Sequence, residues 1–179
     1  MIVNKKGDLL KSENCTAIMH QTNCLGVMGA GIAKQIKARW NNEVFVPYRK
    51  ACLDNINTKE LLGKIQVLRT NETPIEYVIN VFGEYSFTES ECPFPNGRHT
   101  DYEALFQCFK KVKNWCKENG ITNIGMPKNL GCGLAGGDWD GVVYPMIENV
   151  FGEDKDITLN IYEFYVHPYA AVNNNNNNK

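Results

Sequence analysis

The chain has 179 residues, of which 43% are hydrophobic and 22% are charged, a composition that favours one globular domain with a substantial core. Its formal net charge of -1 argues against a dedicated nucleic-acid binder, because such proteins usually carry a basic excess. A small anionic ligand stays compatible with this charge, since backbone amides can bind phosphate. The polar start at Asn4–Lys6 lacks a signal-peptide pattern, and no apolar run is long enough to span a bilayer. We therefore expect no contact with a membrane. Seven cysteines without a CxxC pair indicate reduced thiols, so we expect a cytoplasmic protein.

The first half of the chain alternates strand-like and helical segments. It opens with a short apolar stretch at 1–3 and a turn at Gly7–Leu10. Ile32, Ile36 and Trp40 are four residues apart, the spacing of one helical face. The elements expected here are a strand at 15–20, helices at 31–40 and 47–55, and strands at 64–69 and 76–82.

The second half begins with a long loop at Gly83–Thr100, a length that is more often functional than that of ordinary connections. Asp101–Asn119 is predicted to be an amphipathic helix, capped by Thr100 or Asp101 and ended by Gly120. Further elements are expected as a strand at 122–126, a helix at 141–151 and a strand at 157–165. The asparagine run at 173–178 cannot pack a core, so we predict a domain over 1–168 and a disordered tail over 169–179.

This alternation predicts an α/β fold with a largely parallel sheet covered on both faces. Ligands of such sheets bind at the carboxyl ends of the strands. Two glycine-rich segments, 20–33 and 126–139, fall at such ends, each between a predicted strand and a predicted helix. Glycine-rich turns at a helix N-terminus expose backbone N–H groups to anions, so the pair suggests a clamp for a diphosphate. The alternative is that these glycines only make tight turns.

The second segment also contains G-x-G-x-x-G, as Gly131, Gly133 and Gly136, which formally matches a dinucleotide-binding fingerprint. We disfavour a Rossmann oxidoreductase, because too little chain follows Gly137 to build the further βαβ units of that fold.

Three motifs together resemble the macro domain family over residues 1–166: the sequences at Asn23–Ala33 and Gly131–Trp139, and the opening Gly7-Asp8. The resemblance implies a three-layer α/β/α fold around a mixed, largely parallel sheet, and a cleft for an ADP-ribose derivative as the small-molecule partner. It assigns Asp8 to the adenine and Asn23 to the distal ribose, and it implies that a late aromatic, Phe164 or Tyr165, packs on the adenine. The residues implied to hold the distal ribose and the diphosphate are Gly29, Ala30, Gly31, Ile32, Gly131, Cys132, Gly133 and Leu134.

His20 stands three residues before Asn23 and gives H-x-x-N-C-x-G, which is similar to the macro domain branch that removes phosphate from ADP-ribose 1″-phosphate. By that resemblance His20 and Asp138 are the expected catalytic residues, with Asp140 in reserve. An imidazole and a carboxylate suit phosphate ester cleavage, which needs acid–base help at phosphorus. The alternatives are a buried strand-end histidine at position 20 and an ordinary helix N-cap at Asp138.

Two other functions stay open. Another branch removes ADP-ribose from side chains or DNA bases with a lysine after the central strand and an aspartate directly after G-C-G-L. This chain has Phe82-Gly83-Glu84 and Ala135 near those positions, which disfavours that branch. A binder of ADP-ribose without turnover is the other alternative. Arg98 and His99 are candidates to reach a terminal phosphate, or else belong to a solvated loop. We expect neither metal nor cofactor, because the three histidines lack the spacing of a metal site.

Overall fold

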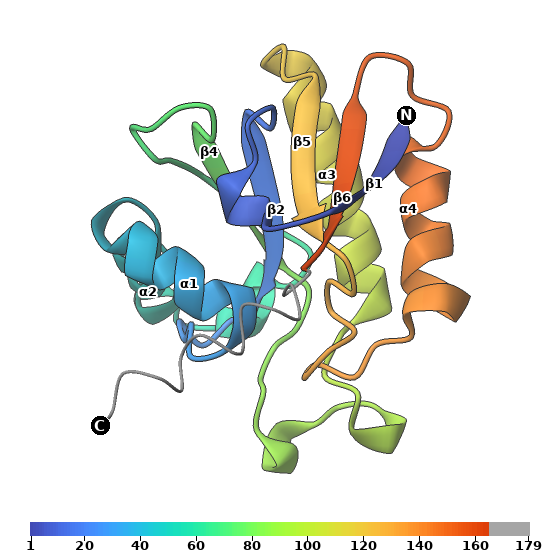
Figure 1. The fold of residues 1–179 in the computed structure, drawn as a ribbon. Helices are drawn as coiled ribbons and strands as arrows, with labels where there is room; N and C mark the ends of the chain where they lie inside the picture. The colour runs from blue at the N-terminus through green and yellow to red at the C-terminus, as the bar shows by residue number, and fades with distance from the viewer. Residues whose placement is uncertain (165–179) are drawn as a thin grey trace, which may run out of the picture.

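A six-stranded sheet lies at the centre of the computed structural model, which describes residues 1–164 (Figure 1). The strands are β1 (Ile2–Lys6), β2 (Ala17–Thr22), β3 (Ile65–Arg69), β4 (Tyr77–Phe82), β5 (Asn123–Pro127) and β6 (Thr158–Glu163). Their order in the sheet is β1-β6-β5-β2-β4-β3. Every neighbouring pair is parallel except β3 and β4, which pair antiparallel at one edge. The predicted mixed, largely parallel sheet is therefore confirmed.

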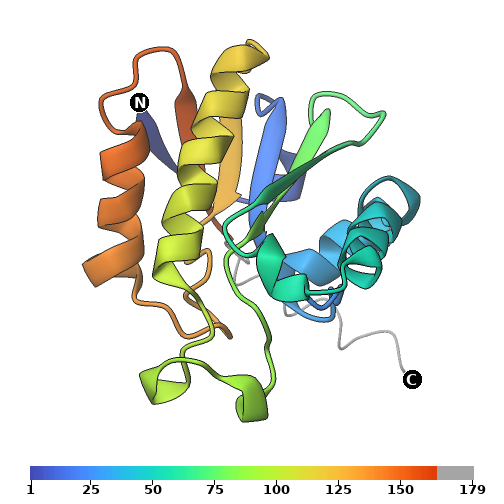
Figure 2. The same ribbon diagram turned by 180° about the vertical axis from the view of Figure 1, so that it is seen from behind.

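Helices cover both faces of this sheet. They are α1 (Gly31–Arg39), α2 (Val46–Asp54), α3 (Tyr102–Glu118) and α4 (Tyr144–Phe151). Figures 1 and 2 show α3 and α4 over one face and α1 and α2 toward the other. Because side chains alternate along a strand, β2 supplies Met19 to the core under α3 and α4, and Ile18 to the core under α1 and α2. The three-layer α/β/α fold is confirmed.

The longest helix, α3, follows directly from its sequence. Its inward residues recur at helical spacing and are buried, namely Leu105, Cys108, Phe109, Val112 and Cys116. The Asp101 carboxylate accepts a hydrogen bond from the Ala104 N–H at 3.0 Å and caps the first turn. Gly120 follows the helix with a φ of +67°, a conformation that glycine adopts without strain.

Several element boundaries differ from the sequence-based prediction. The strand expected at 15–20 runs over Ala17–Thr22. It begins and ends two residues later than predicted, so it includes the first three residues of the first glycine-rich segment. A π-helical turn at Trp139–Val143 precedes α4 in place of a regular helical start. The last strand ends at Glu163, whereas the prediction extended it to residue 165. Tyr165, the predicted boundary at residue 168 and the asparagine-rich tail lie outside the described residues.

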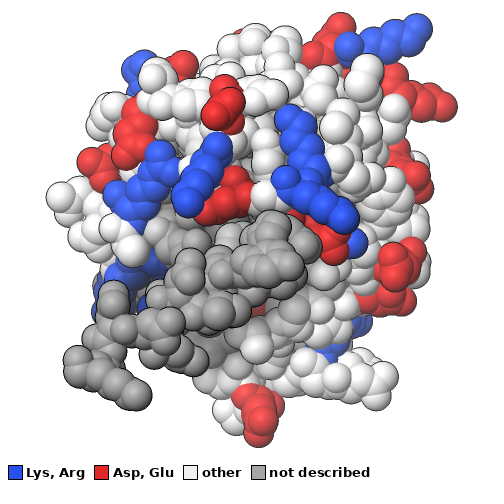
Figure 3. Space-filling model, in the orientation of Figure 1, with Lys and Arg blue, Asp and Glu red and all other residues white. Residues whose placement is uncertain are grey.

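Acidic and basic side chains are intermingled over the face of the molecule shown in Figure 3. Among residues 1–164, no helix combines the length and apolar character needed to cross a membrane. The seven cysteines, all within this range, carry free thiols.

Candidate functional site

A cavity of about 980 Å³ lies at the carboxyl ends of β2 and β5 and beside the chain that leaves β4. Gln21 and Thr22 at the end of β2 line it, as does Pro127 at the end of β5. The rest of the lining comes from three connections: residues 23–33, residues 128–135 and the long segment 84–99. The two glycine-rich segments therefore border one cavity, at the sheet edge to which the sequence assigns them.

Asn23 organises the first glycine-rich segment. Its Oδ1 accepts hydrogen bonds from the N–H groups of Leu25 at 3.0 Å and Val27 at 3.3 Å, and its Nδ2 donates to the Val27 carbonyl at 2.8 Å. The buried Tyr48 hydroxyl also donates to Asn23, with both the side-chain and backbone oxygens at 2.8 Å. Asn23 lines the cavity, and its amide shapes the loop around it.

Helix α1 starts at the cavity. Its N-cap residue, Ala30, makes no side-chain capping hydrogen bond. Gly31, Ile32 and Ala33, the first three residues of the helix, all line the cavity. The first N–H groups of a helix have no partner inside the helix and sit at its positive end. This side of the cavity therefore suits an anion.

The second glycine-rich segment packs tightly against β2. Gly131 has a φ of +73°, and an added Cβ would lie 2.6 Å from Gln21 Oε1. The Gln21 amide donates to Thr100 Oγ1 at 3.0 Å, and that hydroxyl donates to the Gly131 carbonyl at 2.6 Å. Gly133 differs, because a Cβ built on it meets no atom within 4 Å. Gly131 is required by the protein's own packing, whereas Gly133 only faces open space.

The long segment 83–100 is closed at its base. Glu84 and Thr100 form an isolated antiparallel bridge, and the Asp101 N–H donates to the Gly83 carbonyl at 2.8 Å. The His99 N–H donates to the Ala135 carbonyl at 2.8 Å, which ties the base to the second glycine-rich segment. Phe87, Glu89, Cys92 and Gly97 along this segment line the cavity.

His20 lies away from the cavity lining. Its side chain is completely buried, and its Nε2 is 2.7 Å from Asn80 Oδ1, which makes Nε2 the protonated nitrogen. Asn80 donates in turn to Gln66 Oε1 at 3.0 Å, so a polar row crosses β2, β4 and β3. Burial lowers the pKa of His20 to about 4, with the Asn80 hydrogen bond opposing this shift. His20 is therefore a buried histidine inside β2, as the alternative interpretation of the sequence described it.

Asp138 also lies away from the cavity lining and acts as a helix cap. Its Oδ1 accepts a hydrogen bond from the Gly141 N–H at 2.9 Å, at the start of the Trp139–Val143 turn. The Asp138 N–H itself donates to the Tyr102 hydroxyl at 2.8 Å. Asp140, the reserve candidate, is exposed and is not among the lining residues.

Replacing Asp138 with alanine is expected to lower the free energy of unfolding by about 1 kcal/mol, the usual cost of losing an N-cap. Turnover should stay within about twofold of the wild type, since this carboxylate does not line the cavity. Urea unfolding beside an activity assay checks both parts. A hundredfold loss of turnover at unchanged stability would restore Asp138 as a catalytic group.

Three further predicted ligand residues do not line the cavity in the described structure. Asp8 accepts a hydrogen bond from the Leu10 N–H at 2.9 Å and caps a short 3-10 turn. The Cys132 thiol donates to the Leu130 carbonyl at 3.4 Å. Phe164 is 63% exposed. The predicted ligand residues that do line the cavity are Asn23, Gly29, Ala30, Gly31, Ile32, Gly131, Gly133 and Leu134.

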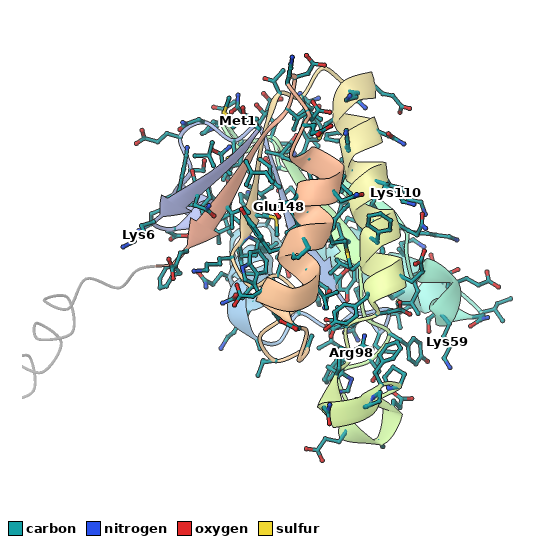
Figure 4. The ribbon with its side chains drawn as sticks, turned by 90° about the vertical axis from the view of Figure 1, so that its right-hand side faces the viewer. Met1, Lys6, Lys59, Arg98, Lys110 and Glu148 are labelled. Atoms are coloured by element: carbon teal, nitrogen blue, oxygen red, sulfur yellow. The ribbon has the colours of Figure 1, made fainter. Side chains whose placement is uncertain are left out.

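Five titratable residues outside the main sequence-based candidates line the cavity, namely Glu84, Glu89, Cys92, His99 and Lys128, and of these Glu84, Cys92 and His99 are partly or largely buried. Glu84 lines the cavity, and burial raises the pKa of its carboxyl to about 7. His99 also lines the cavity, is only 7% exposed and has no hydrogen-bond partner for Nδ1 within the described chain. The neighbouring Arg98 does not line it. Its guanidinium stacks 4.0 Å from the ring centres of both Phe94 and Tyr102, near the start of α3 (Figure 4).

Comparison with known proteins agrees with this architecture. The family model described as the macro domain matches residues 19–146, which include both glycine-rich segments. This chain belongs to the macro domain family. The match places the cavity-lining loops of this macro domain inside the part of the chain that defines the family.

Two curated relatives of this macro domain are named as ADP-ribose or ADP-ribosyl glycohydrolases. It is 29% identical over 157 residues to human ADP-ribose glycohydrolase OARD1, with 88% of each chain covered. It is also 29% identical over 171 residues to the DNA ADP-ribosyl glycohydrolase of Mycobacterium tuberculosis, covering 90% of this chain and 42% of that protein. The solved macrodomain of M. tuberculosis DarG superposes with a TM-score of 0.75 at 28% identity, covering 90% of this chain and 97% of that one.

Proposed function

We propose that this macro domain binds ADP-ribose and hydrolyses a bond at its distal ribose, with ADP-ribose 1″-phosphate as the leading substrate. The observation that carries the proposal is the single cavity lined by the start of α1 and by both glycine-rich segments. Phosphate oxygens accept hydrogen bonds from N–H groups at a helix start, and the helix dipole favours their negative charge. A diphosphate held by two such loops is a natural ligand.

The size of the cavity supports an extended ligand. At about 980 Å³ it lies at the upper end of the range for small-molecule sites, which is roughly 300–1,000 Å³. Exposed apolar side chains border it, with Val27, Phe87 and Leu134 each on a different connection. Nucleoside and ribose surfaces can pack on these groups while the phosphates meet the backbone.

A second candidate, removal of ADP-ribose from a modified macromolecule, is supported by the names of the two glycohydrolase relatives. The lysine and aspartate expected of that branch are not found at the corresponding positions. Ala135, which carries no carboxylate, is a cavity-lining residue, and its carbonyl accepts hydrogen bonds from the N–H groups of His99 and Thr100. Because this lysine and this aspartate are missing, we place ADP-ribose 1″-phosphate first.

We expect this protein to bind ADP-ribose at least about tenfold more tightly than AMP, because AMP lacks the second phosphate and the distal ribose; this is a difference of about 1.4 kcal/mol. Isothermal titration calorimetry with both ligands measures it. Equal affinities would contradict a clamp formed by two loops.

Turnover assays separate the candidate functions. The protein is incubated with ADP-ribose 1″-phosphate while released phosphate is measured, and separately with a mono-ADP-ribosylated protein while released ADP-ribose is measured. Phosphate release supports the leading function and ADP-ribose release the second. Tight binding of ADP-ribose without turnover of either substrate would identify a non-catalytic binder.

A further inference from the structure

The base of segment 83–100 brings two acid–base side chains to the cavity. Glu84 bridges to Thr100, and His99 is the residue before Thr100. Bridged residues lie about 5.5 Å apart and consecutive residues 3.8 Å apart, so the Cα atoms of Glu84 and His99 are within about 9 Å of each other. Both side chains belong to residues that line the cavity.

His99 is held firmly at the wall of the cavity. Its backbone N–H donates to the Ala135 carbonyl at 2.8 Å, and only 7% of the residue is exposed to solvent. The Nδ1 atom is buried and has no hydrogen-bond partner within the described chain. A buried polar atom without a partner is costly, and at a cavity wall a ligand can supply the missing hydrogen bond.

Glu84 has the complementary character. Its side chain is half-buried, and within the described chain no ion pair compensates its charge. Burial raises the pKa of the carboxyl to about 7, so both protonation states are populated near neutral pH. A group with this property transfers protons efficiently at the pH at which a cytoplasmic enzyme would work.

We propose that Glu84 and His99 are the catalytic acid–base pair of this cavity, an assignment that rests on the proposed function. A water oxygen forms a bond to phosphorus while the bond between phosphorus and the C1″ oxygen breaks. The Glu84 carboxylate accepts a proton from that water, and His99, acting as an imidazolium with both ring nitrogens protonated, donates a proton to the departing C1″ oxygen and becomes neutral. ADP-ribose and inorganic phosphate leave, and exchange with solvent returns both side chains to their starting states.

The variants Glu84→Gln and His99→Gln test this assignment. Each should lower phosphate release from ADP-ribose 1″-phosphate by about a hundredfold or more, the scale of a positioned acid–base group. The affinity for ADP-ribose should change by less than about threefold, because the product lacks the phosphate on which the pair acts. Glu84→Gln should also raise the midpoint of thermal unfolding by a few degrees, since it removes a charge that is costly to bury.

Glu91→Gln is the matched control. Glu91 lies on the same segment, accepts a hydrogen bond from Thr88 Oγ1 at 3.2 Å and is not among the cavity-lining residues, so its variant should keep wild-type turnover. An active wild type whose Glu84→Gln and His99→Gln variants are equally active would overturn this assignment and leave the proposed function standing. A wild type that turns over neither substrate would overturn both.

Discussion

Replacing Gly133 with valine is expected to weaken ADP-ribose binding by about a hundredfold or more while leaving the stability of the protein nearly unchanged. Gly133 lines the cavity, and a Cβ there meets no protein atom within 4 Å. Its φ also lies outside the left-handed region, so a side chain is not strained by the backbone. The new side chain therefore fills space that the ligand needs, and a hundredfold change corresponds to about 2.7 kcal/mol of binding free energy.

Calorimetry gives the affinity and thermal unfolding gives the stability. Gly133→Ala is the graded control and should show a smaller loss of affinity with the same stability. Gly131→Val is the contrasting variant and should unfold at lower temperature, because its side chain would collide with Gln21 and Thr100. Wild-type affinity in Gly133→Val would mean that the second glycine-rich segment turns the chain without contacting ligand.

Lowering the pH from 7 to 4 is expected to destabilise this protein through His20. The unfolded chain binds a proton at this imidazole with the ordinary pKa of 6.5, whereas burial lowers the folded-state pKa to about 4. Unfolding therefore takes up a proton between these values, and the free energy of unfolding falls as the pH falls through this range. The His20 contribution is present in full above pH 6.5, and about 3 kcal/mol of it is lost by pH 4.

His20→Gln isolates this effect from the other titrating groups. Its amide can still donate to Asn80 but does not titrate, so urea unfolding at several pH values should show a flatter dependence than in the wild type. Phosphate release at pH 7 should stay within about tenfold of the wild type, because the histidine does not line the cavity. Identical pH dependence would disprove the buried neutral histidine, and a hundredfold loss of turnover would return His20 to the catalytic site.

The position of His20 shows where sequence reasoning reached its limit. The motif around Asn23 predicted that the first glycine-rich segment faces the ligand site, and this segment does line the cavity. The strand was expected to end at His20, yet it continues through Gln21 and Thr22. Two more residues place His20 about 6–7 Å back along β2 from its carboxyl end, beside Asn80 of β4 and not in the cavity lining. Polar residues such as Gln21 look like the start of a loop, although strand pairing with β4 extends over them.

The three-layer fold could be predicted because hydrophobic periodicity shows which segments are strands and helices, and their alternation indicates a parallel sheet covered on both faces. Glu84 and His99 were harder to bring together, since fifteen positions separate them along the chain and only the bridge at the base of segment 83–100 makes them neighbours. The sequence of a long loop contains no local pattern that predicts which of its residues pair at its base. The useful signal was the length of that loop and its start at the end of a central strand.

The closed base of segment 83–100 has a consequence for how this protein can diversify. Hydrogen bonds from Asp101 to Gly83 and from His99 to Ala135 fix the two ends, so the chain between them can be lengthened or exchanged without disturbing the sheet. Doubling the length of such a loop costs only about 0.6 kcal/mol of closure entropy. Phe87, Glu89 and Cys92 on its outer part face the ligand cavity. Grafting the outer part from another macro domain is thus a route to a new range of ligands while the base of the segment stays unchanged.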